Sequence, residues 1–210
     1  DALRVEVAHL NAALRHHSAT DVLRRAVEVL PNLALVSSFG AESVALLHLA
    51  SMVKRDLPVL FIDTQMLFTE TLVYQQELSE RFALRKTRPR AAALTGYDGW
   101  ISGRKRFQSG TRAALEFFEI EAGTDSAPAR IKVNPLAYWS SQDVADYIDE
   151  NRLPRHPLVA QGFPSIGCAP CTSKVAPGED ARAGRWRDQD KEECGIHFVN
   201  GKMVRTGDMT

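Results

Sequence analysis

Three cysteines in the last quarter of the chain have spacings and neighbours suited to chemistry. Cys168 and Cys171 form a Cys-x-x-Cys pair in a segment rich in proline and glycine, and this spacing serves a metal ion, an iron–sulfur cluster or a redox dithiol. Cys194 follows in a polar segment, where lysine, arginine and histidine neighbours can hold a thiol as the nucleophilic thiolate. Two ligands do not close a tetrahedral metal site, and Cys194 is the only other cysteine. Two incidental thiols are the alternative interpretation of the pair.

A second set of candidates occupies a turn of small residues after an apolar run. The turn contains Ser37, Ser38, Gly40, Ala41, Glu42 and Ser43. Glycine lets a ligand approach the backbone, and the hydroxyls and the N–H groups of a helix start can bind an anion. The turn lacks the lysine and the glycine spacing of the common phosphate loops. An ordinary strand–helix turn with a serine cap explains these residues equally well.

Asp63 and Thr64 end the next apolar run, where a nucleotide's base or ribose would be held. A helix N-cap is an equally good explanation of this pair. Basic residues form a further set, at Arg104, Lys105, Arg106 and Arg112 and later at Arg182 and Arg185. The planar guanidinium group suits phosphate or sulfate, although any single arginine is more often a solvated surface charge.

The elements that must position these residues follow from hydrophobic periodicity. Helical spacing covers the first thirty residues, and short apolar runs at 33–36 and 59–62 predict buried parallel strands. Helices are expected at 44–52 and 67–82, weaker strands at 100–102 and 131–133, and a capped helix after Ser140. This alternation predicts an α/β fold, an open, mostly parallel sheet flanked by helices with a loop-rich C-terminal segment. We expect one domain: N-terminal helices at 1–32, a nucleotide-binding α/β core at 33–153 and the cysteine-bearing segment at 154–210.

Composition limits the classes of function. The chain has 210 residues, with 26 Lys and Arg against 26 Asp and Glu, which argues against broad binding to nucleic acids or anionic membranes. No apolar run approaches the roughly 18 residues of a membrane helix, and no signal-peptide pattern opens the chain. Three cysteines cannot form a disulfide framework. We therefore expect a cytoplasmic protein with no nucleic-acid or membrane partner; the pattern is compatible with a homo-oligomer.

Taken together, these motifs resemble the assimilatory sulfonucleotide reductases, and the adenylylsulfate (APS) reductases in particular. The segments that carry the resemblance are 38–43, 63–71, 100–112, 167–172, 179–186 and 193–197, with Lys105 in place of an arginine of the family. The resemblance implies a fold of the PP-loop, adenine nucleotide alpha hydrolase type, in which the first segment is the phosphate loop.

The resemblance also implies a reaction. Cys194 would attack the sulfur of APS and expel AMP, and thioredoxin would release sulfite from the resulting cysteine S-sulfonate. The remaining positions that it assigns to substrate binding are Lys86, Arg106, Arg182, Arg185 and His197. The expected roles are therefore Cys194 as nucleophile, with the phosphate-loop residues, Asp63 and Thr64 and these basic residues holding the nucleotide.

The chain departs from the family at one place. Members with a [4Fe-4S] cluster use an adjacent cysteine pair and a later Cys-x-x-Cys, and only Cys168 and Cys171 match here. The pair should precede the segment 84–89, yet residues 80–83 contain no cysteine. A strand expected after the helix at 67–82 is also missing from the pattern. We therefore predict that roughly thirty residues are omitted near position 83, and that the intact protein carries the cluster.

Three other functions remain open at this stage. The 3′-phosphoadenylylsulfate (PAPS) reductases of the same family lack the cysteine pairs, so Cys168 and Cys171 favour APS. A PP-loop ATP pyrophosphatase would need ATP and magnesium and would leave Cys194 without a role. A zinc- or redox-binding module is the third alternative.

Overall fold

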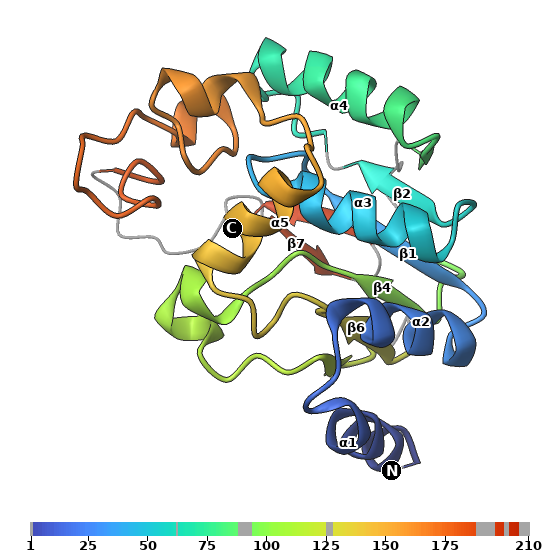
Figure 1. Cartoon of the computed structure of the whole chain (residues 1–210). Helices are drawn as coiled ribbons and strands as arrows, with labels where there is room; N and C mark the ends of the chain where they lie inside the picture. Colours follow the sequence, from blue (N-terminus) through green and yellow to red (C-terminus); the bar gives the residue numbers. More distant parts are fainter. Residues whose placement is uncertain are drawn as a thin grey trace.

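A six-stranded sheet in the order β3-β2-β1-β4-β6-β5 lies at the centre of the molecule (Figure 1). The computed structural model describes residues 2–61, 63–87, 94–124, 128–187, 196–199 and 202–205. The strands are β1 (Leu33–Ser37), β2 (Pro58–Phe61), β3 (Arg85–Thr87), β4 (Gly99–Ile101), β5 (Phe118–Glu121) and β6 (Arg130–Val133). All neighbours pair in parallel except β5, which is antiparallel to β6. The predicted open, mostly parallel sheet is confirmed.

Helices flank the sheet, and most begin and end close to the expected positions. They are α1 (Ala2–Leu14), α2 (Ala19–Val29), α3 (Ser43–Val53), α4 (Thr69–Arg81) and α5 (Ser141–Glu150). The predicted capping box is present, since Ser140 Oγ accepts from the Asp143 amide while the Asp143 carboxylate accepts from Ser140. Helix α3 contacts both α2 and α5, whereas α1 packs beside β5 (Figure 1). No helix within the described ranges is long and apolar enough to cross a bilayer.

Both faces of the central strand β1 are buried, as its continuous apolar run predicts. Leu33 and Leu35 join the large core beneath α2, α3 and α5, whereas Ala34 and Val36 point to the opposite face. That second face carries a small cluster that includes Leu60, Leu94 and Trp100. Packing on both faces of the sheet therefore fixes β1, and with it the start of the turn that follows the strand.

The structure corrects the expectation of a missing strand. Helix α4 ends at Arg81, and the chain turns through Ala83, which has a φ of 51°. Strand β3 then pairs in parallel with β2, with Arg85 opposite Pro58, and forms the edge of the sheet. The expectation was wrong because three polar residues, Arg-Lys-Thr, carry no apolar signature. Strand β5 and the hairpin of β7 (Ile196–Val199) and β8 (Lys202–Arg205) were not predicted either.

The segment after α5 is irregular but anchored to α4. It includes the short turns η3 (Pro157–Gln161) and η4 (Ala169–Cys171). His156 is buried, and its Nδ1 accepts from the Leu158 amide, so Nε2 donates to Thr71 Oγ1 at 2.9 Å. Burial lowers the pKa of His156 to about 4, which keeps the ring neutral. Tyr74 adds a hydrogen bond from its hydroxyl to the Pro154 carbonyl at 2.7 Å.

Candidate active site

A cavity of about 650 Å³ opens at the carboxyl edge of the sheet. Its lining includes the ends of β1 and β4, the two neighbours on either side of the point where the strand order reverses. Ligands of open α/β sheets bind at such a switch point, because the loops leaving the two strands diverge there. The volume is in the range of cofactor-sized pockets.

The turn between β1 and α3 forms one side of this cavity and has little freedom to move. Ser37, Ser38, Gly40, Ala41, Glu42 and Ser43 all line the cavity. Phe39 adopts a φ of 53°, and its buried ring packs edge-on against Phe61 at 5.4 Å, which anchors the turn. A Cβ on Gly40 would lie 2.9 Å from the Ile166 carbonyl oxygen, so the turn and the late loop meet too closely for a side chain there.

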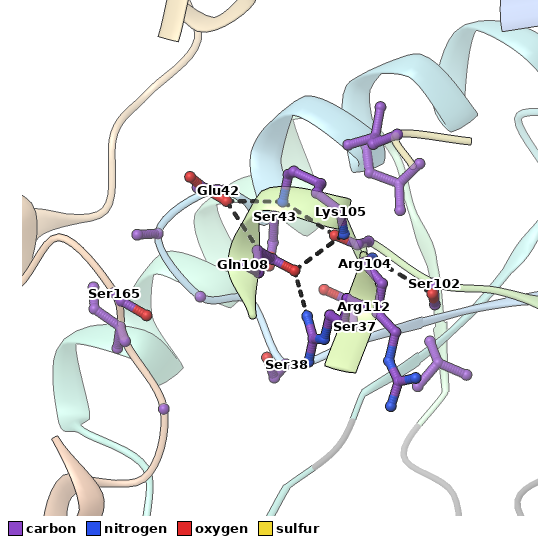
Figure 2. Close-up of a pocket in the computed structure, with 18 of the residues that line it drawn as sticks. Ser37, Ser38, Glu42, Ser43, Ser102, Arg104, Lys105, Gln108, Arg112 and Ser165 are labelled. Atoms are coloured by element: carbon purple, nitrogen blue, oxygen red, sulfur yellow. Dashed lines mark hydrogen bonds and ion pairs between the residues drawn. The ribbon is translucent and has the colours of Figure 1, made fainter. Parts of the chain in front are cut away.

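Lys105 holds Glu42 in place through an ion pair. Its Nζ lies 2.8 Å from Glu42 Oε2 and donates a second hydrogen bond to the Gly103 carbonyl at 3.0 Å. The Lys105 side chain is only 3% exposed, and burial lowers its pKa while the Glu42 carboxylate opposes that shift. Gln108 reaches the same carboxylate and also accepts from Arg112 (Figure 2). Glu42 and Lys105 therefore offset one another's charge while fixing the turn.

Further basic side chains enter the cavity from two directions. Arg104 and Arg112 follow β4, and Lys132 stands on β6 with its Nζ 3.7 Å from Glu119 and 5.2 Å from the centre of the Trp100 ring. Burial lowers the pKa of Lys132 to about 8, with the Arg104 charge as the second cause. Arg182 and Arg185 enter from the late loop and lie over the ring of Trp186, at 5.5 and 4.5 Å. The cavity is thus suited to an anion.

The late loop also brings Cys168 to the cavity. Its sulfur is buried and lies 3.1 Å from Thr64 Oγ1, within hydrogen-bond range. Cys171 is half-buried and lies outside the lining, and no disulfide joins the two. Within the described residues, no cluster of three or more Cys, His, Asp or Glu side chains could hold a metal ion. This part of the chain thus provides two thiols and no third ligand beside them.

Backbone hydrogen bonds tie the Cys-x-x-Cys segment to the segment of the two arginines. The Trp186 amide donates to the Cys171 carbonyl at 3.0 Å, and the Ser173 amide donates to the Gly184 carbonyl at 2.8 Å. The Arg185 guanidinium lies directly on Gly167, where a Cβ would come within 2.3 Å of a guanidinium nitrogen. The shape of the cysteine segment therefore sets where Arg185 lies.

Two expected site residues, Arg106 and Asp63, are not brought to the cavity. Arg106 points elsewhere: it donates to the Leu115 carbonyl and to Glu116, and its guanidinium stacks 4.0 Å from the centre of the Tyr138 ring. Asp63 is outside the lining and accepts from the Gln65 amide at 2.9 Å. It does not cap a helix either, because α4 begins only at Thr69.

The remaining expected residues fall wholly or partly outside the described part of the chain. Lys86 lies on β3 and His197 on β7, but their side chains are outside the described set. Cys194 lies outside the described residues altogether. Their expected roles in binding and catalysis stay predictions.

The cavity also contains residues that sequence reasoning did not select. Trp100, Glu119, Glu121 and Lys132 come from β4, β5 and β6 and belong to its lining. Lys132 did leave a signal, because a cation between Ile131 and Val133 interrupts an otherwise apolar strand. Arg104 and Arg112 belonged to the basic segment already noted, but only the fold shows that they, rather than Arg106, enter the cavity.

Comparison with known proteins assigns the chain to a family. The model of the phosphoadenosine phosphosulfate reductase domain matches residues 32–85 and 82–174. The chain is 40% identical over 233 aligned positions to an adenosine 5'-phosphosulfate reductase of Mesorhizobium japonicum, covering 94% of this chain and 89% of the relative. It is 34% identical over 223 positions to the protein of the same name from Shouchella clausii, covering 90% and 91%.

Solved structures agree with this assignment. A phosphoadenylyl-sulfate reductase from Candida auris, crystallised as a phosphate complex, superposes with a TM-score of 0.66 at 25% identity and covers 80% of this chain and 96% of that one. An FMN adenylyltransferase of Candida glabrata superposes with a TM-score of 0.61 at 15% identity, covering 83% and 78%, and shows the fold alone. The predicted PP-loop type of adenine nucleotide fold is confirmed.

Proposed function

Because the chain belongs to the phosphoadenosine phosphosulfate reductase domain family, we propose that it cleaves adenylylsulfate reductively to sulfite and AMP. One observation carries the proposal: the β1–α3 turn, the basic side chains and Cys168 all line the same cavity. A nucleotide bearing a phosphosulfate needs an anion-binding turn and several cations, and both are present. Sulfite produced in this way would supply the sulfur for cysteine synthesis in assimilatory sulfate reduction, as the family resemblance implies.

Nucleotide binding would use the two sides of the cavity together. The hydroxyls of Ser37, Ser38 and Ser43 and the positive end of the helix dipole at the start of α3 would hold the phosphate. Arg182 and Arg185 would neutralise the phosphosulfate oxygens and favour AMP as a leaving group. We propose the same role for Lys86 and His197, and place Thr64 near the nucleoside.

The proposed chemistry takes place in two displacements. The Cys194 thiolate attacks the sulfur of adenylylsulfate; a sulfur–sulfur bond forms, the bond from sulfur to the bridging oxygen breaks, and AMP leaves with the electron pair. A thiolate of thioredoxin then attacks the Cys194 sulfur and expels sulfite, giving a mixed disulfide. The second thiol of thioredoxin resolves that disulfide, so thioredoxin ends oxidised and Cys194 returns as thiolate. This need for reduced thioredoxin supports a cytoplasmic location.

The family's iron–sulfur cluster has no step in this scheme. Of four cysteines that a [4Fe-4S] cluster of this family uses, the chain offers Cys168 and Cys171, and its described part supplies no third ligand beside them. The residues at hand do not fit the group, and every step above is carried by the chain's own side chains and by thioredoxin.

Sulfite release tests the proposal directly. With thioredoxin and its reductant present, the chain is expected to produce sulfite and AMP from adenylylsulfate. Cys194→Ser is expected to abolish sulfite release and to bind AMP with unchanged affinity, whereas Ser51→Ala, on the far part of α3, leaves both unchanged. Full activity of Cys194→Ser would refute the mechanism.

A second candidate is reduction of the 3′-phosphorylated nucleotide. Two observations favour it: the absence of the adjacent cysteine pair, and the similarity to the Candida auris reductase. A ratio of kcat/KM for the two nucleotides decides the question. Preference for the 3′-phosphorylated substrate would replace the substrate in the proposal while leaving the thiol chemistry intact.

A further inference from the structure

The cysteine count of this chain is too small for the cluster of its family. Cys168, Cys171 and Cys194 are its only cysteines. Cys194 could serve as a third ligand only by giving up the thiolate that the proposed reaction needs. The described residues hold no cluster of acids, histidines or cysteines that would replace the missing ligands.

The missing pair also has no suitable place in the fold. A cysteine pair just before Leu84 would lie at the end of α4, whose start adjoins Cys168 through the bridge between Leu67 and Cys168. Helix α4 has 13 residues, so its two ends lie roughly 20 Å apart. Strand β3 then begins opposite Pro58, at the amino edge of the sheet. Cysteines placed there would be far outside the reach of a cluster bound to Cys168 and Cys171.

The comparison with the family model places the positions that this chain lacks at the same point, between α4 and β3. The family model matches the chain in two pieces, residues 32–85 and 82–174, which overlap at residues 82–85. The alignment with the Mesorhizobium relative runs over 233 positions, whereas the chain has 210 residues, so that relative carries positions with no counterpart here. In this chain a short turn from Phe82 to Leu84 joins α4 to β3, and the sheet is continuous without the extra positions.

Hydrogen bonds within the protein hold the cysteine segment in place. The Cys171 amide donates to the Cys168 carbonyl at 3.0 Å, and Thr172 Oγ1 donates to the same carbonyl at 2.9 Å. The Trp186 amide reaches the Cys171 carbonyl, and Thr172 bridges to Arg185. These bonds are backbone or local contacts, so they need no metal.

We infer that this chain does not hold the four-cysteine iron–sulfur cluster of its family, and that contacts within the protein, without a metal, hold the Cys168–Cys171 segment against the loop of Arg182 and Arg185. Both cysteines then stay as thiols, with Cys168 beside Thr64 at the nucleotide cavity. The inference rests on the proposed function at one step, where Cys194 is reserved for the reaction. Iron content and sulfite production are measured separately, so the failure of one is distinguishable from the failure of the other.

Iron content tests the inference. The chain and the Mesorhizobium relative are purified without oxygen, incubated with ferrous iron, sulfide and dithiothreitol, desalted, and assayed for iron, acid-labile sulfide and visible absorption. The expected result is well below one iron per chain and no broad visible band for this chain, in contrast to the relative. AMP binding, measured by calorimetry on the same sample, is expected to remain.

A double variant, Cys168→Ser with Cys171→Ser, separates bound from adventitious iron. The inference expects its residual iron to equal that of the parent chain. About four iron atoms per chain or per pair of chains, lost in the double variant, would overturn it. Loss of AMP binding in the iron-free parent chain would overturn the second half, that contacts within the protein suffice to hold the loop.

Discussion

The two sides of the cavity hold their cations in different ways. On the sheet side, formed by the β1–α3 turn and strands β4 to β6, Lys105 pairs with Glu42 and Lys132 faces Glu119. On the loop side, formed by residues 165–168 with Arg182 and Arg185, the two arginines lie over Trp186. Backbone bonds to the cysteine segment hold that loop.

The cations on the two sides of the cavity therefore contribute to different properties, stability on one side and ligand binding on the other. A lysine buried against a carboxylate contributes to the fold, since removing it leaves a charge without compensation. An arginine stacked on an aromatic ring keeps its planar fork for a ligand and costs the fold less when replaced. We therefore expect the sheet side to govern stability and the loop side to govern affinity for the anion.

The largest expected effect is on stability. Lys105→Met should lower the free energy of unfolding by roughly 2–4 kcal/mol, because Glu42 loses its partner at 2.8 Å. Arg182→Met, the matched change on the loop side, should cost less than about 1 kcal/mol. Urea unfolding of the two variants measures both. Combining Lys105→Met with Glu42→Gln should recover part of the loss, and equal losses from the two single variants would remove the distinction between the sides.

A smaller effect is expected on affinity, this time from the loop side. Arg185→Met should weaken AMP binding by about tenfold, the value of one charge-assisted contact of about 1.4 kcal/mol. Arg106→Met is the control, since its guanidinium is engaged with Leu115, Glu116 and Tyr138 outside the cavity. Calorimetry should show affinity within twofold of the parent for the control. A comparable loss in both variants would return Arg106 to the binding site.

The smallest effect is a pH dependence that belongs to the sheet side. The pKa of Lys132 is about 8, so its ammonium is charged below that pH and neutral above it. AMP affinity should therefore fall, by about three- to tenfold, as the pH rises from 7 to 9. Lys132→Met should bind AMP more weakly at pH 7 and show a flat profile over this range.

The control for this profile is Lys54→Met, at the end of α3, which should keep the parent profile. A profile unchanged by Lys132→Met would assign the titration to another group. Bound nucleotide should in turn raise the pKa of Lys132, because an anion favours the charged form.

Where apolar patterns were strong, sequence reasoning placed the elements well. Strands β1 and β2, helices α3 and α4 and the cap at Ser140 all follow from periodicity and cap chemistry. Strand β3 was not predicted, because a polar edge strand of three residues shows no hydrophobic periodicity. The prediction that Arg106, and not Arg112, binds the substrate does not match the cavity lining, for a related reason. Nearby basic residues cannot be told apart in the sequence. Their orientation depends on the path of the backbone through η1 (Arg106–Gln108) and η2 (Gly110–Arg112).

The amino-acid sequence by itself determined the family, the α/β alternation and the presence of a small-residue turn, a Cys-x-x-Cys pair and one further thiol. These features depend on residue type and local spacing, and both can be read directly from the sequence. Tertiary structure alone decided which cations enter the cavity, that Lys105 is paired with Glu42, and that Lys132, from a strand far along the chain, completes the site. It also decided that β3, which follows α4 directly, completes the edge of the sheet without the extra positions of the relatives. Such outcomes depend on burial and on contacts between segments distant in sequence, which only packing specifies.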